Sequence, residues 1–362
     1  MLITSVVGAR PNFMKIAPVV LELRRRGISQ RLIHTGQHYD AAMSKVFFED
    51  LAMPEPDVYL GVGSGSHAQQ TARVMVAIEE ECQKNRPDLL VVGGDVNSTV
   101  AAAMAAAKLG IPVAHVEAGL RSFDRAMPEE INRVVTDHLS DFLLTSESSG
   151  NANLLREGIA PEKIHLVGNC MVDSLRKHYD RAVAGRPWEA YGAEPFSYAL
   201  LTLHRPSNVD TDSRLMELMA LAGRIAEEIS VIFPVHPRTR QRLGALGRQL
   251  PASFLLIEAQ PYIAFLGLMA ASRLVLTDSG GIQEETTALQ IPCLTLRHNT
   301  ERPSTVEMGT NAIVGDDLDL AYRLVEQILR GEWKKGTVPT LWDGHAALRV
   351  ADVLLGERAA LA

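Results

Sequence analysis

Residues 89–118 read LLVVGGDVNSTVAAAMAAAKLGIPVAHVEA, and this stretch decides the fold class. Two short runs of consecutive apolar residues, LLVV and IPVA, stand on either side of an Ala-rich helical pattern. A strand that is apolar throughout, rather than at alternate positions, is covered by helices on both faces of its sheet. The stretch therefore predicts a βαβ unit of a parallel sheet.

The same alternation of short apolar runs and helical patterns continues through the whole chain. The first series of expected strands comprises LITSVVG from Leu2, RLIHT from Arg31, LLVVGG from Leu89, PVAHV from Pro112 and FLLTS from Phe142. After a polar stretch over residues 184–195, a second series comprises YALLTL from Tyr198, VIFPV from Val231, FLLIE from Phe254, LVLTD from Leu274, PCLTL from Pro292 and AIVG from Ala312. With 362 residues, the chain is expected to form two doubly wound α/β halves.

Composition and charge exclude several classes of protein. A content of 46% hydrophobic and 22% charged residues is typical of a globular protein, and a net charge of -7 argues against a nucleic-acid partner. The cysteines Cys82, Cys170 and Cys293 form no CxxC pair, which favours a reducing compartment. Because neither a signal peptide nor a membrane-spanning run is recognisable, we expect a cytoplasmic protein without membrane insertion.

The first expected strand ends in GARPNFMK, residues 8–15. Pro11 suits the first turn of a helix, so Arg10 and Lys15 would stand near a helix N-terminus, which favours anions such as a diphosphate. The alternative is a solvated arginine and a surface lysine. The segment is neither a Walker loop nor a GxGxxG fingerprint, so nothing here indicates ATP or NAD.

Two carboxylates follow neighbouring strands of the first half. Asp95 comes after LLVVGG, and Glu117 comes at the end of the next expected strand. Two acids at one sheet edge can have their pKa values pushed apart, leaving one as a proton donor and the other as an acceptor. The alternative for Asp95 is a role in capping the helix that Asn97 or Ser98 opens.

The segment MPEEINR, residues 127–133, contains a further polar pair. Pro128 can start a helix on which Glu129 and Arg133 share one face. An ordinary surface ion pair explains the same pattern.

In the second half, His204 and His236 each follow an expected strand and lie next to arginine-containing segments. This pattern favours phosphate binding or charge stabilisation. A structural role is the alternative for each histidine. Their spacing fits no zinc motif, so we expect no metal.

The segment LTDSGGIQEE, residues 276–285, is the most specific one. Ser279, Gly280 and Gly281 form a turn of small residues from strand to helix, whose backbone N–H groups can approach a diphosphate. Glu285, about one helical turn later, is placed to accept hydrogen bonds from ribose hydroxyls. A glycine-rich turn before a solvated acidic helix is the alternative.

Taken together and in this order, GARPNFMK, GGDVNST, HVEAGLRS, MPEEINR, LTLHRPSN and LTDSGGIQEE resemble the non-hydrolysing UDP-N-acetylglucosamine 2-epimerases. The resemblance implies a glycosyltransferase-B-like fold: two Rossmann-like doubly wound domains facing across a cleft that holds a UDP-sugar. It implies an N-terminal domain over residues 1–169 with a C-terminal helix over 345–362, and a UDP-binding domain over 170–344. It also implies a homodimer and no cofactor.

The resemblance also carries functional roles to individual residues. It implies catalytic roles for Asp95, Glu117, Glu129, Arg133 and His204. It implies a substrate-binding set of Arg10, Lys15, His236, Ser279, Gly280, Gly281, Glu285 and Arg302. Gln37 and His38 match part of a regulatory UDP-sugar site. The reaction implied is elimination of UDP to 2-acetamidoglucal and re-addition of UDP after protonation of the opposite face, which needs acids, bases and cations.

Several alternatives stay open at this stage. GARPNFMK and TGQHYD are also similar to relatives that act on a UDP-2,3-diacetamido uronic acid. A hydrolysing epimerase would release UDP and N-acetylmannosamine, and a true glycosyltransferase would use the same fold. A nucleotide-sugar sensor would bind without catalysis, although several carboxylates beside a phosphate site favour an enzyme.

Overall fold

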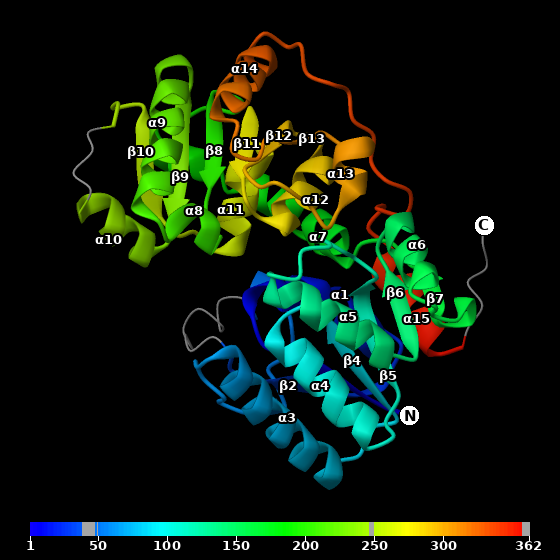
Figure 1. Cartoon of the computed structure of the whole chain (residues 1–362). Coiled ribbons are helices and arrows are strands. Elements are labelled where there is room, and N and C mark those ends of the chain that lie inside the picture. The colour runs from blue at the N-terminus through cyan, green and yellow to red at the C-terminus, as the bar shows by residue number, and fades with distance from the viewer. Residues whose placement is uncertain (38–47, 49, 246–249, 357–362) are drawn as a thin grey trace. The chain divides into compact units, whose positions relative to one another are not determined.

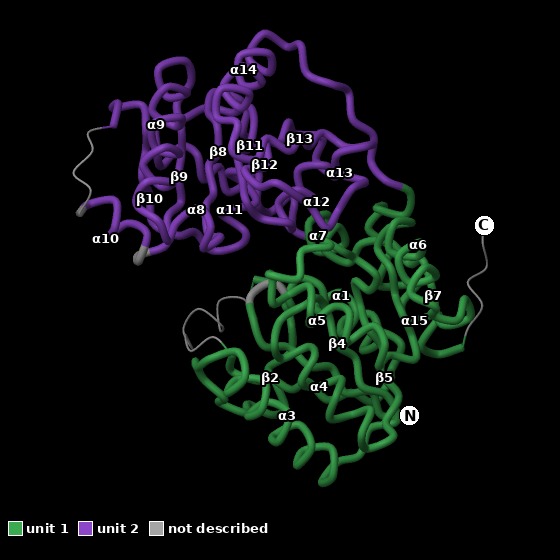
Figure 2. The backbone as a smooth tube through the Cα atoms, viewed as in Figure 1, with its two compact units in different colours: residues 1–177, 340–362 green, residues 178–339 purple. Residues whose placement is uncertain are grey.

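The computed structural model describes residues 1–37, 48, 50–245 and 250–356. The chain forms two compact units, which Figure 2 distinguishes by colour. Unit 1 comprises Met1–Lys177 and Thr340–Ala362, and unit 2 comprises His178–Pro339. The division passes through helix α7 (Cys170–Ala184). Each unit contains its own parallel sheet.

Unit 1 has a seven-stranded sheet in the order β3-β2-β1-β4-β5-β6-β7 (Figure 1). All of its neighbouring strands pair in parallel. The strands are β1 (Leu2–Val7), β2 (Ser29–His34), β3 (Val58–Tyr59), β4 (Leu89–Gly93), β5 (Val113–Ala118), β6 (Phe142–Thr145) and β7 (Ile164–Leu166). Strands β4 and β5 are buried along their whole length, as the continuous apolar sequence of β4 predicts; in β5 the burial includes His115 and Glu117.

The helices of unit 1 follow most of its strands. They are α1 (Arg10–Arg25), α3 (His67–Lys84), α4 (Asn97–Lys108), α5 (Pro128–Leu139), α6 (Ser148–Arg156), the 3₁₀ turn η1 (Pro161–Lys163), the first part of α7, and α15 (Ala346–Leu354). The alanines of α4 give it a slim face, and they pack with α3 and β4 in one core cluster. Helix α15 packs against α1, and Arg26 and Asp352 form an ion pair of 2.6 Å nearby.

Unit 2 has a six-stranded parallel sheet in the order β10-β9-β8-β11-β12-β13. Its strands are β8 (Tyr198–Thr202), β9 (Ser230–Val235), β10 (Phe254–Glu258), β11 (Leu274–Thr277), β12 (Cys293–Thr295) and β13 (Asn311–Ile313). Its helices, after the end of α7, are η2 (Pro187–Tyr191), α8 (Pro206–Val209), α9 (Asp212–Glu228), α10 (Pro237–Ala245), α11 (Tyr262–Ala270), α12 (Gly280–Leu289), α13 (Pro303–Glu307) and α14 (Leu318–Leu329).

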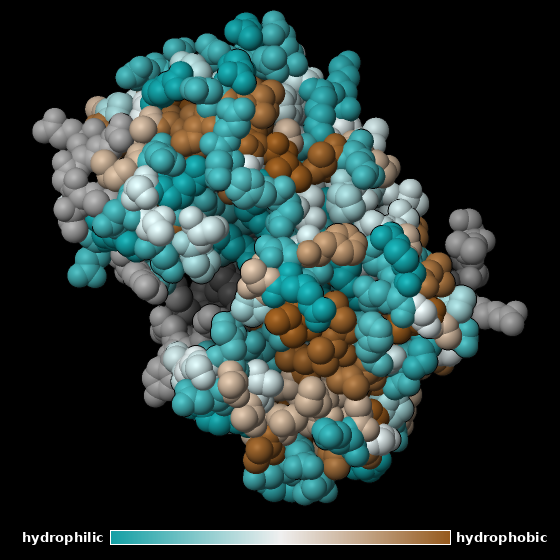
Figure 3. All heavy atoms as spheres, in the orientation of Figure 1, coloured by the Kyte–Doolittle hydropathy of each residue, from teal (hydrophilic) through white to brown (hydrophobic). Residues whose placement is uncertain are grey.

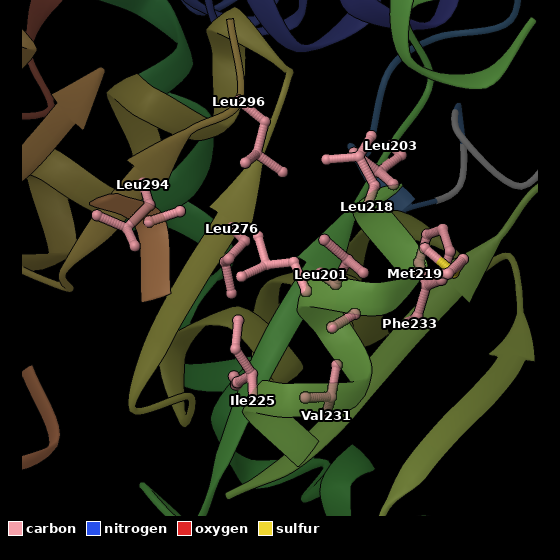
Figure 4. Close-up of a cluster of buried hydrophobic side chains, with 14 of the residues drawn as sticks. Leu201, Leu203, Leu218, Met219, Ile225, Val231, Phe233, Leu276, Leu294 and Leu296 are labelled. Carbon is pink, nitrogen blue, oxygen red and sulfur yellow. The ribbon is translucent and has the colours of Figure 1, made fainter. Parts of the chain in front are cut away.

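One hydrophobic core cluster of unit 2 joins its sheet to helices α9 and α14. In Figure 4, Leu201, Phe233 and Leu276 of three strands point toward Leu218 and Ile225 of the helix. All five side chains are buried, and apolar surface removed from water is the main favourable term in folding. This core fixes the positions at which β8, β9 and β11 end.

The strand order reverses at one place in each sheet. In unit 1 the chain leaves from β1 to one side and from β4 to the other, and in unit 2 the reversal lies between β8 and β11. Ligands of open α/β sheets bind beyond the carboxyl ends of the strands at such a point. The segments after these strands are therefore where a functional site is expected.

The predicted fold class, two doubly wound α/β halves, is confirmed. Each expected strand has its counterpart, whereas β3 and β7 were missed. They are edge strands of two and three residues and are only partly buried, so their sequences contain no long continuous apolar run. Among the described helices, none is both long and apolar enough to span a membrane.

The surface of unit 1 carries an apolar area. Figure 3 shows apolar side chains gathered on the face of unit 1 that carries α4 and α5. A shallow groove between α3 and α5 is lined mostly by apolar groups, including Met75 and Ile131. Val76 of α3 and Ile131 of α5 are among the exposed large hydrophobic residues.

Candidate functional site

Asp95 and Glu117 lie at the carboxyl ends of neighbouring strands of unit 1. Strands β4 and β5 pair in parallel with Gly93 opposite Val116, so Asp95 and Glu117 emerge at the same edge. The side chain of Glu117 is buried, and that of Asp95 is 18% exposed. The expectation that both carboxylates share one sheet edge agrees with this register.

A buried lysine accompanies Glu117. Lys15 of α1 is 4% exposed, and its Nζ lies 2.6 Å from Glu117 Oε1. Gly94 makes room for it, since a Cβ at that residue would lie 2.8 Å from Lys15 Nζ. Lys15 is therefore no surface lysine but one half of a buried ion pair. Arg10 is the first residue of α1, whose N-terminal turn contains Pro11 as predicted.

Asp95 has a cation of its own. Arg133 of α5 donates from Nη1 to Asp95 Oδ2 at 2.8 Å and from Nη2 to Glu130 Oε2 at 2.9 Å. Arg133 is 2% exposed, so the interpretation as a surface ion pair is wrong for it. The N-cap residue of α4 is Val96, not Asp95, and it makes no side-chain cap bond. Glu129 lies half-buried in the first turn of α5, which Pro128 begins as predicted.

Glu130 explains why Arg133 is held so firmly. Its carboxylate also accepts hydrogen bonds from the Ser122 N–H and hydroxyl and from the Phe123 N–H, all within 3.0 Å. The loop before α5, the carboxylate and the guanidinium thus form one buried network that ends on Asp95. Sequence reasoning missed Glu130, because its neighbour Glu129 fits the same helical face pattern.

In unit 2, His204 and Asp278 form an ion pair where the strand order reverses. His204 follows β8, Asp278 follows β11, and His204 Nδ1 lies 2.7 Å from Asp278 Oδ1. The carboxylate also accepts from the N–H groups of His204 and Arg205 and from Asn208 Nδ2. Burial alone would raise the pKa of Asp278, but these hydrogen bonds and the His204 charge lower it below its ordinary value.

Asp278 was not among the predicted site residues. It stands directly before Ser279 in the LTDSGGIQEE segment. The segment was recognised as a site, but the pairing of Asp278 with His204 was not predicted. Only the pairing of β8 with β11 brings it to His204. Because Nδ1 of His204 faces Asp278, Nε2 is the ring nitrogen left for a ligand, and 55% of the His204 side chain is exposed.

The turn from β11 to α12 is built as the small residues predict. Ser279 is the N-cap residue and makes no side-chain cap bond, and α12 begins with Gly280 and Gly281. The first N–H groups of a helix have no partner within the helix and attract anions. A Cβ at Gly280 would lie 2.4 Å from Arg302 Nη1, so a glycine is needed here for the packing of Arg302.

Arg302 and Glu285 lie within unit 2 rather than on its surface. Arg302 is 4% exposed and lies 3.0 Å from Glu284 and 3.2 Å from Glu301. Glu285 is buried as well, and its Oε1 accepts a hydrogen bond of 3.0 Å from the Tyr262 hydroxyl. His236 directly follows β9 and is exposed.

Of the two residues predicted for a regulatory site, the structure describes Gln37 but not His38. Gln37 is buried in unit 1, and its Oε1 accepts from the N–H and the hydroxyl of Ser98 at 3.1 and 2.7 Å. This contact ties the end of β2 to the first turn of α4. His38 lies outside the described residues.

In chemical terms, unit 1 presents two carboxylates that each have a buried cation, an arrangement suited to proton transfer. Unit 2 presents a helix N-terminus beside a histidine, an arrangement suited to a diphosphate. Among the described residues, no cluster of His, Cys, Asp and Glu could hold a metal ion.

Comparison with known proteins decides the family. The sequence model of the UDP-N-acetylglucosamine 2-epimerase family matches residues 21–355. The chain belongs to the UDP-N-acetylglucosamine 2-epimerase family. A family member of this name from Methanocaldococcus jannaschii is 44% identical over 345 residues, covering 92% of this chain and 94% of the relative.

Two further comparisons place the chain within the epimerase family. The solved structure of Methanocaldococcus jannaschii UDP-GlcNAc 2-epimerase in complex with UDP-GlcNAc and UDP is 41% identical, with a TM-score of 0.90, covering 98% of this chain and 100% of that chain. UDP-2,3-diacetamido-2,3-dideoxy-D-glucuronate 2-epimerase of Pseudomonas aeruginosa is 38% identical, covering 98% of this chain and 99% of the relative. The fold is thus the glycosyltransferase-B-like fold of the epimerase family.

Proposed function

We propose that this chain interconverts UDP-N-acetylglucosamine and UDP-N-acetylmannosamine by inverting C2 of the sugar. The pairing of Asp95 with Arg133 and of Glu117 with Lys15 at one sheet edge carries the proposal. Two carboxylates at one site supply both a base for the C2 proton and an acid for its return. Family membership supports the choice of a UDP-amino sugar.

The proposed reaction has two halves. A carboxylate removes the C2 proton, the C1–O bond breaks with its electron pair leaving on UDP, and a C1=C2 double bond forms in 2-acetamidoglucal. A proton then adds to the opposite face of C2 as UDP returns to C1. We assign the acid and base work to Asp95, Glu117 and Glu129, with Arg133 and His204 as polar partners that stabilise developing charge.

Most of the proposed UDP site belongs to residues 170–344, and Arg10 and Lys15 are proposed to contribute from the N-terminal domain. The turn of Ser279, Gly280 and Gly281 would receive the diphosphate through the N–H groups at the start of α12, since the Ser279 N–H donates to Thr277 Oγ1 at 3.0 Å. Glu285 would bind the ribose. Arg10, Lys15, His236 and Arg302 complete the proposed set. Lys15 and Arg302 are held in place by buried ion pairs. This supports a role in which the two cations attract the diphosphate from fixed positions. No cofactor is part of this proposal.

A second candidate substrate is a UDP-2,3-diacetamido uronic acid. The Pseudomonas aeruginosa relative that carries this activity in its name is 38% identical, whereas UDP-N-acetylglucosamine 2-epimerase of Escherichia coli K12 is 30% identical. The same C2 chemistry would serve both sugars, because both carry an acetamido group at that carbon. The substituents at C3 and C6 therefore distinguish the candidates.

One experiment separates these possibilities. The purified full chain is incubated with UDP-N-acetylglucosamine in deuterated water without added metal or NAD, and the anomeric and C2 protons are followed by NMR. UDP-N-acetylmannosamine with deuterium at C2 supports the proposal, whereas free N-acetylmannosamine with UDP indicates a hydrolysing enzyme. If no exchange occurs, the same assay with the diacetamido uronic acid nucleotide tests the second candidate. No exchange with either leaves a sensor or a glycosyltransferase.

Variants test the assigned carboxylates. Asp95→Asn and Glu117→Gln are expected to abolish C2 exchange while circular dichroism and UDP binding by calorimetry stay as in the wild type. Glu79→Gln makes the same chemical change at an exposed residue of α3 and serves as the control. Exchange close to the wild-type rate in either test variant would refute the assignment.

We also propose that the enzyme is a cytoplasmic homodimer in which a second copy covers the apolar groove between α3 and α5. Light scattering is expected to give twice the mass of one chain, and Ile131→Lys in the groove is expected to lower the measured mass.

Regulation at Gln37 and His38 is proposed as well. It predicts that added UDP-N-acetylglucosamine changes the rate at which a different UDP-sugar is epimerised.

A further inference from the structure

Glu117 has an unusual backbone conformation. Its φ is 70°, in the left-handed region that non-glycine residues rarely adopt. The register between β5 and β6 shifts between Val116 and Ala118, so Glu117 stands at an irregularity of the ladder. Such irregularities next to active sites re-aim a side chain, and they persist only where the surroundings hold them. The neighbouring side chains should therefore contain the groups that hold it.

His115, two residues before Glu117, has both of its ring nitrogens engaged. Nδ1 lies 2.7 Å from Asp137 Oδ1, and Nε2 lies 2.8 Å from the Gly94 carbonyl oxygen. A carbonyl can only accept, and so can an ionised carboxylate. Burial alone would raise the pKa of Asp137, but the charges and hydrogen bonds of His115 and Arg121 lower it. The ring of His115 is thus held at both ends, by the Gly94 carbonyl oxygen and by the Asp137 carboxylate.

Asp137 of α5 binds residues on both sides of Glu117 in the chain. One oxygen receives His115, and the other accepts from the Gly119 N–H at 3.1 Å and lies 2.7 Å from Arg121 Nη1. Arg121 in turn makes a two-pronged bond to Glu157 at 2.8 and 2.7 Å. The carboxylate is fully buried and held from three directions. It therefore fixes the residues that flank Glu117 on both sides.

The other end of the His115 ring reaches the neighbouring strand. Gly94, whose carbonyl it contacts, directly precedes Asp95. The His115 ring thus connects the segment before Asp95 with the Asp137 carboxylate, which holds the bulge at Glu117. His115 and Asp137 are both 0% exposed, so neither can touch a substrate.

We propose that His115 and Asp137 are positioning residues that hold the left-handed bulge at Glu117 and fix the spacing of Glu117 from Asp95. The inference rests on the proposed function, because it assigns the purpose of the bulge to the acid and base carboxylates. Without the pair, β5 relaxes toward a regular strand, in which the direction of each side chain alternates, and the Glu117 carboxylate turns away.

The test uses His115→Gln and Asp137→Asn in the full chain. Because a misplacement of about 1 Å can cost 10²-fold in rate, kcat for C2 epimerisation is expected to fall roughly 100-fold, with KM and the affinity for UDP unchanged. His138→Gln, the same change at an exposed residue next to Asp137, is the control and keeps the wild-type kcat. An unchanged kcat in both test variants overturns the inference. So does a loss of UDP affinity that accompanies the loss of kcat, which indicates a purely structural role.

A second measurement decides the question even if the variants do not fold. Wild-type protein labelled with ¹⁵N-histidine is expected to show one ring N–H that exchanges slowly with solvent, because the His115 ring is buried and bonded at both nitrogens. A spectrum in which every histidine ring N–H exchanges rapidly refutes the bridge between Gly94 and Asp137. Inactivity of the wild type on both UDP-sugars would refute the proposed function instead, and the histidine spectrum does not depend on that result.

Discussion

Lys15 Nζ and Glu117 Oε1 lie 2.6 Å apart, although 102 residues separate them in the chain. Helix α1 supplies the lysine and strand β5 the glutamate, and both side chains are almost completely buried. A buried ion pair needs both partners, because a single charge left without its counterpart is costly in a poorly solvated place. The pair is therefore part of the fold as well as of the proposed site.

Replacement of one member of this pair should destabilise the protein. Lys15→Met is expected to lower the free energy of unfolding by about 3–5 kcal/mol, since it leaves the Glu117 carboxylate without this cation. Urea-induced unfolding followed by circular dichroism measures the change. In the double variant Lys15→Met with Glu117→Gln, no charge remains, and part of the stability should return. Strictly additive losses would show that the two side chains do not stabilise each other.

The acid stability of the protein should depend on Asp278. Its pKa is below the ordinary value of 3.8, so its ionised form stabilises the fold above that pH. This contribution is lost as the pH falls from about 3.8 through the lower pKa of the folded state. Asp278→Asn is therefore expected to unfold at a lower temperature near neutral pH and to lose less stability on acidification, as measured by calorimetry.

A matched control for Asp278 exists on the surface of unit 2. Asp316 also pairs with a histidine, His298, at 2.9 Å, but both side chains are more than half exposed. Exposed ion pairs contribute little to stability. Asp316→Asn should leave the melting temperature almost unchanged at every pH. Equal effects of the two substitutions would show that burial of Asp278 is not the cause.

His34 should make stability decline in mildly acidic solution. Burial between Phe13 and Tyr59, with ring centroids at 5.4 and 4.8 Å, lowers the pKa of His34 from 6.5 to about 4. The unfolded chain takes up a proton first, so stability is complete above pH 6.5 and is lost as the pH falls from 6.5 through about 4. The difference corresponds to roughly 3 kcal/mol.

Unfolding free energies between pH 7 and pH 4.5 test this expectation. His34→Phe keeps the stacked ring and removes the titrating group, so it should flatten the pH dependence. His138→Gln removes an exposed histidine and should leave the wild-type slope in place. A slope unaffected by His34→Phe would assign the acid sensitivity to other groups.

Gly280→Ala should disturb the turn before α12. The new Cβ would lie 2.4 Å from Arg302 Nη1, and Arg302 cannot withdraw without breaking its pairs with Glu284 and Glu301. Overpacking of this kind costs typically about 1–3 kcal/mol, and we expect weaker UDP binding by calorimetry as well.

Gly223→Ala on α9 is expected to stabilise the protein. Its Cβ would meet nothing closer than 3.8 Å, and alanine favours a helix interior over glycine, so stability should rise by roughly 0.5–1 kcal/mol. A loss of stability in Gly223→Ala would show that the helix does not tolerate an added methyl group. If stability and UDP affinity were unchanged in Gly280→Ala, Arg302 would have to move freely.

Much of the candidate site could be predicted because its residues stand at strand ends. Asp95, Glu117 and His204 each stand at the end of an apolar run that is long enough to recognise. In a parallel sheet such ends lie at the carboxyl edge, in unit 1 for Asp95 and Glu117 and in unit 2 for His204. Arg302 and Lys15 were predicted as ligand-facing cations, and the structure adds the buried carboxylates that hold them. Local sequence could not indicate the pair of Lys15, because its partner Glu117 lies 102 residues away in the chain.

The residues that sequence reasoning missed share one property. Glu130, Asp137 and Asp278 are buried carboxylates that each have at least one hydrogen-bond or ion-pair partner outside their own helix or turn. On a helix such as α5, Asp137 has the spacing of an ordinary polar residue, and nothing local distinguishes it from exposed His138. Burial and charge pairing are properties of the packed molecule, so the periodicity of one segment cannot indicate them.

The sequence by itself determined the parallel sheets, their division into two halves and the edge at which the polar residues gather, because apolar runs and small-residue turns act through local backbone geometry and burial. The tertiary structure alone decided which cation meets which carboxylate and where the backbone departs from the regular strand at Glu117. Those features depend on distances of a few ångströms between segments remote in the chain, and such distances exist only after the sheet and helices have packed.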